Sequence, residues 1–291
     1  MTRTMAIRNG DLSVEIVPSL GAGLARFDHG RTPLFRPWPH GGSTNPFDLA
    51  CNLLVPWSNR ISGGGFTFDN TFHELLPNVA GEPFPIHGNG FSREWDVDSL
   101  MPDKARLSLV SEGPGPYRYR AEVAYALTER ALDLRLRVLN RAPVRLPFGL
   151  GIHPWFPRTA LTTLHAPASQ VCLELPSHLP DRFEDVATCP DWDFATPAAL
   201  PSGWINNAFA GWAGVASIYW PEQDRGLRIE ASPALGFYLI YSPSQASDFV
   251  CFEPVSHAVD AHNRGSLDKW NGLSVLGPGE SLVAGCSFAV M

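Results

Sequence analysis

Apolar and polar residues alternate along several short stretches of the chain. In the clearest, residues 132–138, four apolar residues would face one way and three charged residues the other. A period of two is the pattern of a β-strand with one buried face. Similar runs predict strands at residues 12–16, 121–127, 227–229 and 235–241, the last of them apolar on both faces.

Turn-forming residues punctuate these runs throughout. The chain has 27 prolines and 26 glycines, and no window of a dozen residues shows a helical apolar stripe free of both. Many short strands with frequent turn signals are typical of a β-sandwich or barrel. Without an internal repeat, a low-complexity tract or a linker, we predict one all-β domain spanning residues 1–291.

Composition narrows the class of protein. With 291 residues, 44% hydrophobic and 18% charged, the chain can bury a sizeable core. A net charge of −7 argues against nucleic acid or an anionic membrane as partner, since both attract a basic surface. No run of 18 apolar residues is present, and the N-terminus turns polar too early for a signal peptide, so we expect neither a membrane span nor export.

Five cysteines are scattered along the chain with no C-x-x-C spacing. An odd, dispersed set fits free thiols in a reducing cytoplasm better than a disulfide framework or a zinc site. We therefore expect a cytoplasmic protein and assign none of the cysteines to catalysis.

The chemistry of the chain centres on residues 149–157, where His153 lies between two glycines and a Pro-Trp-Phe sequence. Pro154 disfavours a helical conformation at His153, so we expect the imidazole at a strand end or turn. Trp155 and Phe156 add flat apolar surface beside this proton-transfer group. That combination suits a sugar, which has polar edges and an apolar face. The alternative is a buried core histidine with a satisfied ring.

Three other loop-like stretches carry reactive side chains. Asn59 and Arg60 precede three glycines, and an arginine fork can bind two oxygens at once. His87 precedes Gly-Asn-Gly, and Glu253 ends an apolar run, where an unpaired buried carboxylate would be costly. Each has a plainer explanation: Arg60 in a loop-pinning salt bridge, His87 solvated, and Glu253 in a strand-end ion pair.

Together these residues form an acid–base set without a nucleophile triad. G-x-S-x-G, H-E-x-x-H, H-x-H, dinucleotide and P-loop patterns are all absent from the sequence. His257 and His262 are five residues apart in a loop-like segment, which is poor spacing for a metal site. We therefore expect no metal and no cofactor.

The ordered motifs resemble the aldose 1-epimerase (galactose mutarotase) family across nearly the whole chain. The resemblance rests on Asn59-Arg60, His87-Gly88, His153-Pro154-Trp155-Phe156 and Phe252-Glu253-Pro254. Residues 17–22, and residues 66–72 read as the strand after the arginine, resemble it too. It implies a large antiparallel β-supersandwich of the galactose mutarotase-like type.

The resemblance also implies an isomerase that interconverts the α and β anomers of a free sugar. Glu253 would remove the proton of the anomeric hydroxyl, and His153 would protonate the ring oxygen. The ring then opens, the C1–C2 bond rotates, and the ring closes on its other face. His87 would bond near the ring oxygen, and Asn59 and Arg60 would bind hydroxyls.

One position departs from the family pattern. Family members commonly carry an aspartate shortly before a phenylalanine, where this chain has Asn206. We expect Asn206 to bind substrate, but an amide both donates and accepts, so the identity of the sugar stays open. Asp191 or Asp193, just upstream, could supply the carboxylate instead.

Other functions are compatible with the same motifs. A hexose-6-phosphate 1-epimerase would need cations near the phosphate, for which Arg60, Arg93 and Arg264 are candidates. A sugar-binding or sensor protein could use the same fold without turnover. A glycoside hydrolase is less favoured because it usually needs two placed carboxylates. In every case the partner is a small sugar, bound by a monomer or homodimer.

Overall fold

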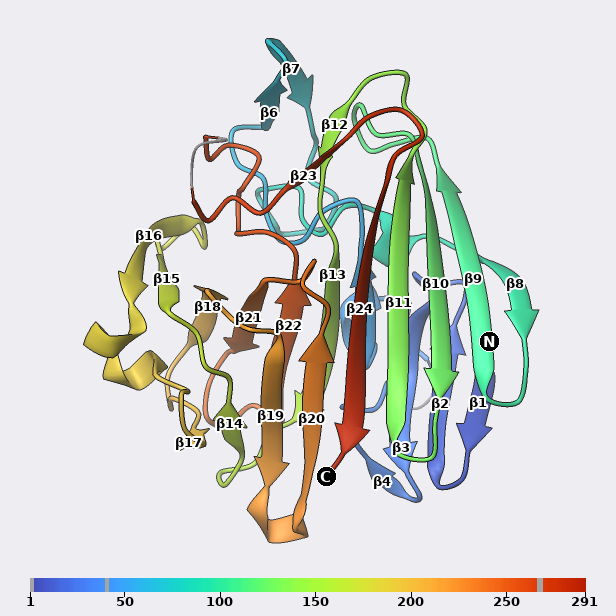
Figure 1. The fold of residues 1–291 in the computed structure, drawn as a ribbon, viewed down its shortest axis with the longest axis vertical. Coiled ribbons are helices and arrows are strands. Elements are labelled where there is room, and N and C mark those ends of the chain that lie inside the picture. The colour runs from blue at the N-terminus through green and yellow to red at the C-terminus, as the bar shows by residue number, and fades with distance from the viewer. Residues whose placement is uncertain (1–2, 40–41, 266–268) are drawn as a thin grey trace.

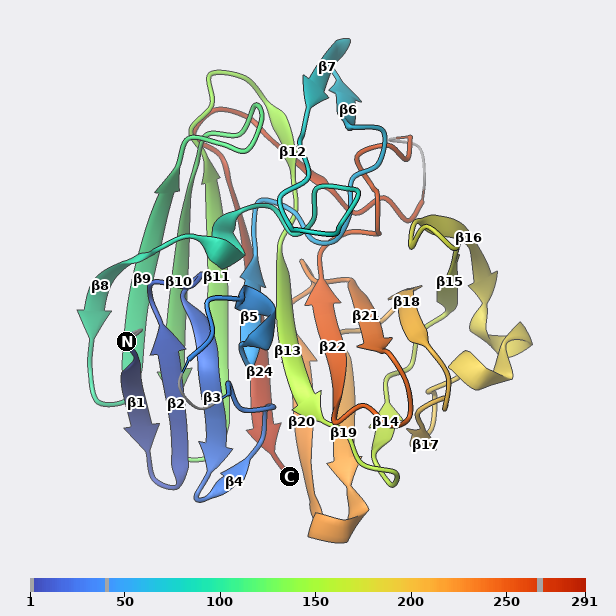
Figure 2. The same ribbon diagram turned by 180° about the vertical axis from the view of Figure 1, so that it is seen from behind.

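The computed structural model describes residues 3–39, 42–265 and 269–291. Two large antiparallel sheets face one another across the molecule (Figures 1 and 2). Within the described ranges the helical elements are five 3₁₀ turns of three residues each, and no α-helix occurs. The predicted all-β class is confirmed.

The larger sheet has eleven strands, ten of them in one path and β4 paired to β3 at the side. In spatial order they are β1 (Met5–Asn9), β2 (Leu12–Val17), β3 (Gly23–His29), β5 (Cys51–Leu54), β13 (Gly151–Pro157), β22 (Phe249–Val255), β21 (Phe237–Ser242), β18 (Ile205–Ala210), β15 (Gln170–Glu174) and β16 (Pro180–Asp185), with β4 (Thr32–Pro33).

The second sheet has nine strands. In order they are β17 (Ala198–Ala199), β14 (Thr163–His165), β19 (Val215–Trp220), β20 (Arg225–Ala231), β24 (Ser281–Val290), β11 (Ala131–Asn140), β10 (Tyr119–Leu127), β9 (Lys104–Ser111) and β8 (Asp96–Leu100). Two small ribbons pair β6 (Gly65–Phe68) with β7 (Thr71–Glu74), and β12 (Leu146–Phe148) with β23 (Ser274–Leu276). The 3₁₀ turns are η1 (Pro46–Asp48), η2 (Gly90–Ser92), η3 (Val186–Thr188), η4 (Pro190–Trp192) and η5 (Pro221–Gln223).

The alternating runs form the strands that they predict. β2, β10, β11 and β20 contain the expected stretches, and all four apolar residues of the 132–138 run are buried. The run at 235–241 becomes β21 two residues late, because Leu235 lies in a turn in which its backbone N–H donates to Ser232.

Two local expectations were wrong. His153 lies inside β13, between β5 and β22, and not at a strand end or turn. Proline only excludes the helical region at the preceding residue, and an interior strand position satisfies that restriction equally well. Residues 66–72 form no single strand: Asp69 and Asn70, with φ of +50° and +59°, turn the chain between β6 and β7.

Apolar side chains from both large sheets meet in the core. Phe35 packs edge-on against Phe156 of β13 and against Phe288 of β24, with ring centroids 5.1 Å apart in each pair. Ile152 and Phe252 belong to the same buried cluster. The side-chain alternation of β13 and β22 therefore turns His153 and Glu253 to the opposite face of the eleven-stranded sheet, away from this core.

No helix in the described ranges has the length and apolarity needed to cross a membrane.

Candidate active site

A cavity of about 470 Å³ opens on the outer face of the eleven-stranded sheet. That volume lies within the range of about 300–1,000 Å³ that is common for small-molecule sites. All seven residues predicted for the site line this cavity: Asn59, Arg60, His87, His153, Trp155, Asn206 and Glu253. The sequence stretches that carry them are far apart in the chain, and the sheet brings them together.

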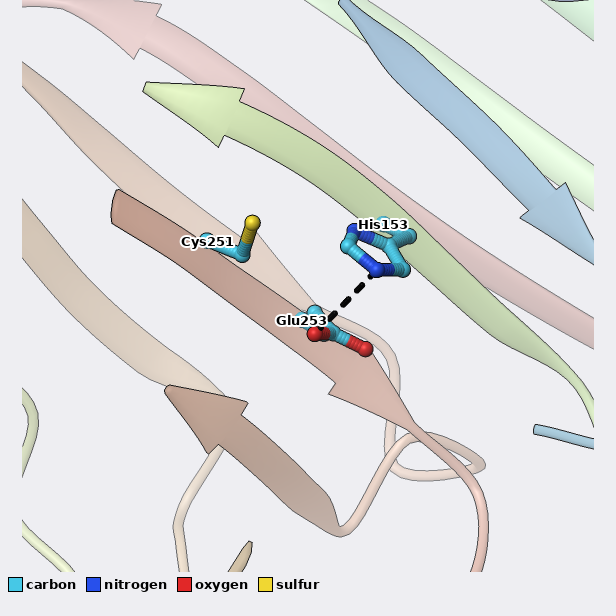
Figure 3. A group of neighbouring side chains, drawn as sticks. All are labelled: His153, Cys251 and Glu253. Atoms are coloured by element: carbon cyan, nitrogen blue, oxygen red, sulfur yellow. Dashed lines mark ion pairs between the residues drawn. The ribbon is translucent and has the colours of Figure 1, made fainter. Parts of the chain in front are cut away.

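His153 and Glu253 form a buried pair on adjacent strands (Figure 3). The register between β13 and β22 places them directly opposite one another. Pro154 has no N–H to donate, so the ladder between the strands is interrupted at this point. His153 Nε2 lies 3.3 Å from Glu253 Oε1, and both side chains are at most 5% exposed.

Burial acts on the two members of the pair in opposite directions. It raises the pKa of Glu253 from 4.5 to about 8, while the nearby positive charge of Arg60 acts to lower it. Burial lowers the pKa of His153 from 6.5 to about 3. Near neutral pH the pair therefore holds one proton, which a transfer over 3.3 Å would move between carboxyl and imidazole.

Cys251 lies two residues before Glu253 on the same face of β22 (Figure 3). Its sulfur, a nitrogen of His153 and an oxygen of Glu253 lie within 4.8 Å of one another. These three donors could be bridged by a metal ion. Burial raises the pKa of the Cys251 thiol well above its usual value, so the free side chain is a neutral thiol.

His87 is held in one tautomer by the loop that precedes β6. The backbone N–H of Asn59 donates to His87 Nδ1 at 3.0 Å, so in the neutral ring the proton is on Nε2. Burial and the nearby His153 and Arg60 lower the pKa of His87, which keeps this ring neutral. Its ring packs edge-on against the His153 ring, with the two ring centroids 5.4 Å apart. His87 thus offers a hydrogen-bond donor beside the imidazole of the pair.

The backbone around His87 is strained. Asn59 and His87 both have positive φ, 59° and 61°, a region that residues other than glycine rarely adopt. The two residues also exchange a second bond, from His87 N–H to the Asn59 carbonyl at 3.1 Å. Gly88 follows with a φ of +67°, and a Cβ there would lie 2.2 Å from the Val55 carbonyl oxygen. Strain of this kind is often found where a site must be held in place.

Arg60 lines the cavity and also makes the salt bridge that was its alternative explanation. Its guanidinium donates twice to Glu82, with N–O distances of 2.9 and 2.8 Å. Its side chain is only 11% exposed. Glu82 also lines the cavity, so Arg60 is fixed there as one half of a neutral pair.

The aromatic surface differs from the one expected. Phe156 turns into the core, and Trp155 is only 6% exposed. His153 stacks on the Trp155 ring at 5.2 Å, and the Arg36 guanidinium lies over that ring at 4.2 Å. Trp155 therefore supports the His153 imidazole more than it offers an open face. The open aromatic ring is Trp204, 46% exposed on the far wall of the cavity.

A carboxylate stands behind that far wall. Glu174, on β15, accepts hydrogen bonds from Trp204 Nε1 at 2.5 Å and from Asn206 Nδ2 at 2.6 Å. His178 Nδ1 lies 3.2 Å from the same carboxylate and its ring stacks on Trp204. Three residues that line the cavity therefore share one acidic partner.

Comparison with known proteins gives this arrangement a context. The sequence pattern of the aldose 1-epimerase family matches residues 3–289. The chain is 36% identical to the uncharacterised protein YphB of Escherichia coli K12 over 98% of its own length and 97% of that protein. It belongs to the aldose 1-epimerase family.

Solved structures agree with this membership. A crystal structure of a candidate aldose 1-epimerase from Escherichia coli K12 superposes with a TM-score of 0.92, at 34% identity and with 99% of each chain covered. The fold alone is shared with a galactose mutarotase-like protein from Clostridium acetobutylicum (TM-score 0.86, 17% identity, 99% and 95% covered). The same holds for a GalM/aldose epimerase homologue from C. elegans (TM-score 0.84, 17% identity, 100% and 99% covered). The predicted galactose mutarotase-like fold is confirmed.

The candidate site residues in the motifs that resemble the aldose 1-epimerase family line the cavity. The two aspartates considered as substitutes for the carboxylate at position 206 do not. Asp191 belongs to η4 and Asp193 directly follows it, and neither lines the cavity. The carboxylate nearest to Asn206 is Glu174, which comes from a neighbouring strand. Of the cations considered for a phosphate, Arg93 and Arg264 do not line the cavity, and Arg264 lies over the Phe183 ring at 5.2 Å.

Several residues in or behind the cavity escaped sequence reasoning. Glu82, Tyr241 and His178 line the cavity, and Glu174 bonds to its wall. Glu82 lies in a loop and Glu174 at the end of the short strand β15, and at such positions the sequence alone does not separate an acid that serves a site from a solvated one. Their position at the cavity becomes clear only from the residues that they bond in the folded chain: Arg60 for Glu82, and Trp204 and Asn206 for Glu174.

Proposed function

We propose that this protein is an aldose 1-epimerase that interconverts the α and β anomers of a free, unphosphorylated sugar. The observation that carries the proposal is the His153–Glu253 pair, 3.3 Å apart and buried beside a cavity of monosaccharide scale. Such a pair supplies the proton acceptor and donor that ring opening requires.

The reaction begins with the proton of the pair on the imidazole. Glu253 accepts the proton of the anomeric hydroxyl while His153 donates its proton to the ring oxygen. The C1–O5 bond breaks, and C1 becomes an aldehyde. The proton of the pair is now on the carboxyl, which is the distribution that burial favours. After rotation about C1–C2, Glu253 returns a proton to O1 and His153 removes one from O5 as the ring closes.

His87 supports the step at the ring oxygen. His87 lines the cavity beside His153, and its proton is on Nε2 because Nδ1 accepts from the Asn59 N–H. A neutral donor there stabilises negative charge on O5 without competing for the proton of His153. Each proton-transfer group typically contributes about 10²–10⁴-fold to a rate, or roughly 3–5 kcal/mol of barrier.

The charges around the cavity favour an unphosphorylated sugar over a hexose 6-phosphate. Among the described lining residues, Arg60 is the one arginine or lysine, and its Nε and Nη2 donate to the two carboxylate oxygens of Glu82. Glu253 and Glu82 add acidic groups to the lining. A phosphate dianion would meet in this cavity only a guanidinium whose charge Glu82 already balances.

The first experiment follows optical rotation after dissolving α-glucose, α-galactose or glucose 6-phosphate, with and without the protein. We expect the two free sugars to reach equilibrium faster than their spontaneous rate and the phosphosugar to be unaffected. Acceleration of the phosphosugar alone would replace this function with the phosphosugar alternative. Sugar binding detected by saturation-transfer NMR, without any acceleration, would support the sensor alternative.

A further inference from the structure

The far wall of the cavity is organised around Glu174. Its strand β15 pairs with β18 as far as Cys172 and Ala208, and the same register continued by two residues brings Glu174 to Asn206, with which it is hydrogen-bonded. Glu174 Oε1 accepts from Trp204 Nε1, and Oε2 accepts from Asn206 Nδ2 and contacts His178 Nδ1. The Glu174 side chain is 19% exposed and does not itself line the cavity. It acts on a ligand only through these three neighbours.

A carboxylate fixes which way the Asn206 amide points. It has only acceptor atoms, so the amide nitrogen must face Glu174. The amide oxygen then points away from Glu174, and no donor in the described part of the chain bonds to it. Because Asn206 lines the cavity, this oxygen is an oriented acceptor for a sugar hydroxyl.

We propose that Glu174 determines which sugar hydroxyl pattern the cavity accepts, by holding the Asn206 oxygen toward the ligand and the Trp204–His178 stack beside it. The inference rests on the proposed function in so far as the ligand is a sugar. Glu174 is a positioning residue: its negative charge lies behind the wall and acts through the Asn206 amide, which is itself uncharged.

Substituting Glu174→Gln reverses the polarity that Asn206 presents. Trp204 Nε1 still needs an acceptor, so the glutamine oxygen stays with Trp204 and its nitrogen meets Asn206. Asn206 must then turn its oxygen toward residue 174 and its nitrogen to the cavity. An acceptor for a sugar hydroxyl becomes a donor, although the size of every side chain is nearly unchanged.

The double variant E174Q/N206D restores the acceptor. The glutamine amide donates to one oxygen of the new carboxylate, and the other oxygen faces the cavity. In N206D alone, two carboxylates would meet where the native hydrogen bond is 2.6 Å long, so that single variant should bind poorly. Two harmful single changes that compensate each other identify a direct hydrogen-bonded pair.

The test measures the dissociation constants of glucose, galactose and their monodeoxy derivatives by NMR titration, together with kcat and KM from polarimetry. We expect one deoxy derivative to bind the native protein about tenfold more weakly than its parent sugar, the effect of leaving a buried acceptor unpaired. In E174Q we expect this preference to disappear and KM to rise about tenfold, while kcat changes little. In the double variant E174Q/N206D we expect KM to return to within about threefold of the native value.

Glu129→Gln is the matched control, since Glu129 is exposed in the turn between β10 and β11. Unchanged deoxy-sugar preferences in E174Q, or a double variant weaker than both singles, would overturn the inference. If E174Q does not fold, Asn206→Ala must abolish the same preference. Failure to bind any of these sugars also refutes it. A different result would refute the proposed function: sugars that bind to the native protein but whose mutarotation is not accelerated.

Discussion

Gly149→Ala tests how the buried interior holds the loop that contains Ser58 and Asn59. A Cβ at residue 149 would lie 2.0 Å from Cδ2 and 2.3 Å from Nε2 of His257. The His257 ring is 2% exposed and fixed on both sides: Nε2 accepts from the Ser58 N–H at 3.0 Å, and Nδ1 donates to the Ala258 carbonyl at 2.8 Å. Burial lowers the pKa of His257 to about 4, which keeps Nε2 a free acceptor at neutral pH.

The cost of this substitution has two parts. Overpacking a close-packed interior costs about 1–3 kcal/mol. Moving His257 leaves the buried Ser58 N–H without an acceptor, which costs about another 1–3 kcal/mol. We therefore expect the free energy of unfolding to fall by about 2–6 kcal/mol. Because Asn59 follows Ser58 and bonds His87, we also expect kcat/KM to fall.

Urea denaturation followed by circular dichroism measures the first effect, and polarimetry measures the second. Gly236→Ala is the control, since the nearest atom to its added Cβ is 3.9 Å away and its stability should change by less than about 0.5 kcal/mol. Native stability in Gly149→Ala would refute the packing argument. Reduced stability with native kcat/KM would refute the link from His257, through Ser58 and Asn59, to His87.

Two further predictions concern the proton pair directly. The rate should follow a broad bell-shaped dependence on pH. Activity is lost at acid pH when the pair gains a second proton, near the lowered pKa of His153 at about 3. It is lost at alkaline pH when the pair loses its only proton, near the raised pKa of Glu253 at about 8. Because Arg60 lowers the pKa of Glu253, Arg60→Met should move the alkaline limb to higher pH. A shift to lower pH would contradict the assignment of this limb to Glu253. So would an alkaline limb of the native protein near an ordinary carboxyl pKa. Treatment with EDTA should leave the rate unchanged, because proton transfer between oxygen and nitrogen needs no cation, and Cys251→Ala should remain active. Loss of activity on chelation with recovery on adding Zn²⁺ would instead make the His153, Cys251 and Glu253 donors a functional metal site.

The sequence predicts the fold well where alternation is strong. The 132–138 run could be read directly because its charged residues alternate with buried leucines in β11. It did not reveal that His153 lies inside β13, since Pro154 restricts the backbone in the same way at a turn and in a strand. The hairpin at Asp69 and Asn70 was missed because the aromatic residues on both sides made residues 66–72 look like one continuous strand. The turn depends on a positive φ at both residues, which the sequence does not state directly.

The site was predictable as far as motifs reach. Order along the chain selected His153 and Glu253, and the sheet register places them opposite each other. Trp155 looked like an open surface because its flanking sequence carries no sign of the Arg36 guanidinium that lies over it. Glu174 could not be selected from the sequence, because its hydrogen bonds with Trp204 and Asn206 form only across the pairing of β15 with β18.

The most direct measurement is polarimetry on fresh α-glucose and α-galactose with the native protein, Glu253→Gln and Glu129→Gln at equal concentration. Glutamine keeps the size of Glu253 but cannot accept and return the proton. The account predicts that the native protein and the Glu129 variant accelerate mutarotation equally, and that Glu253→Gln loses about 10²–10⁴-fold in rate with unchanged circular dichroism. A correctly folded Glu253→Gln protein that keeps the native rate would contradict the central claim.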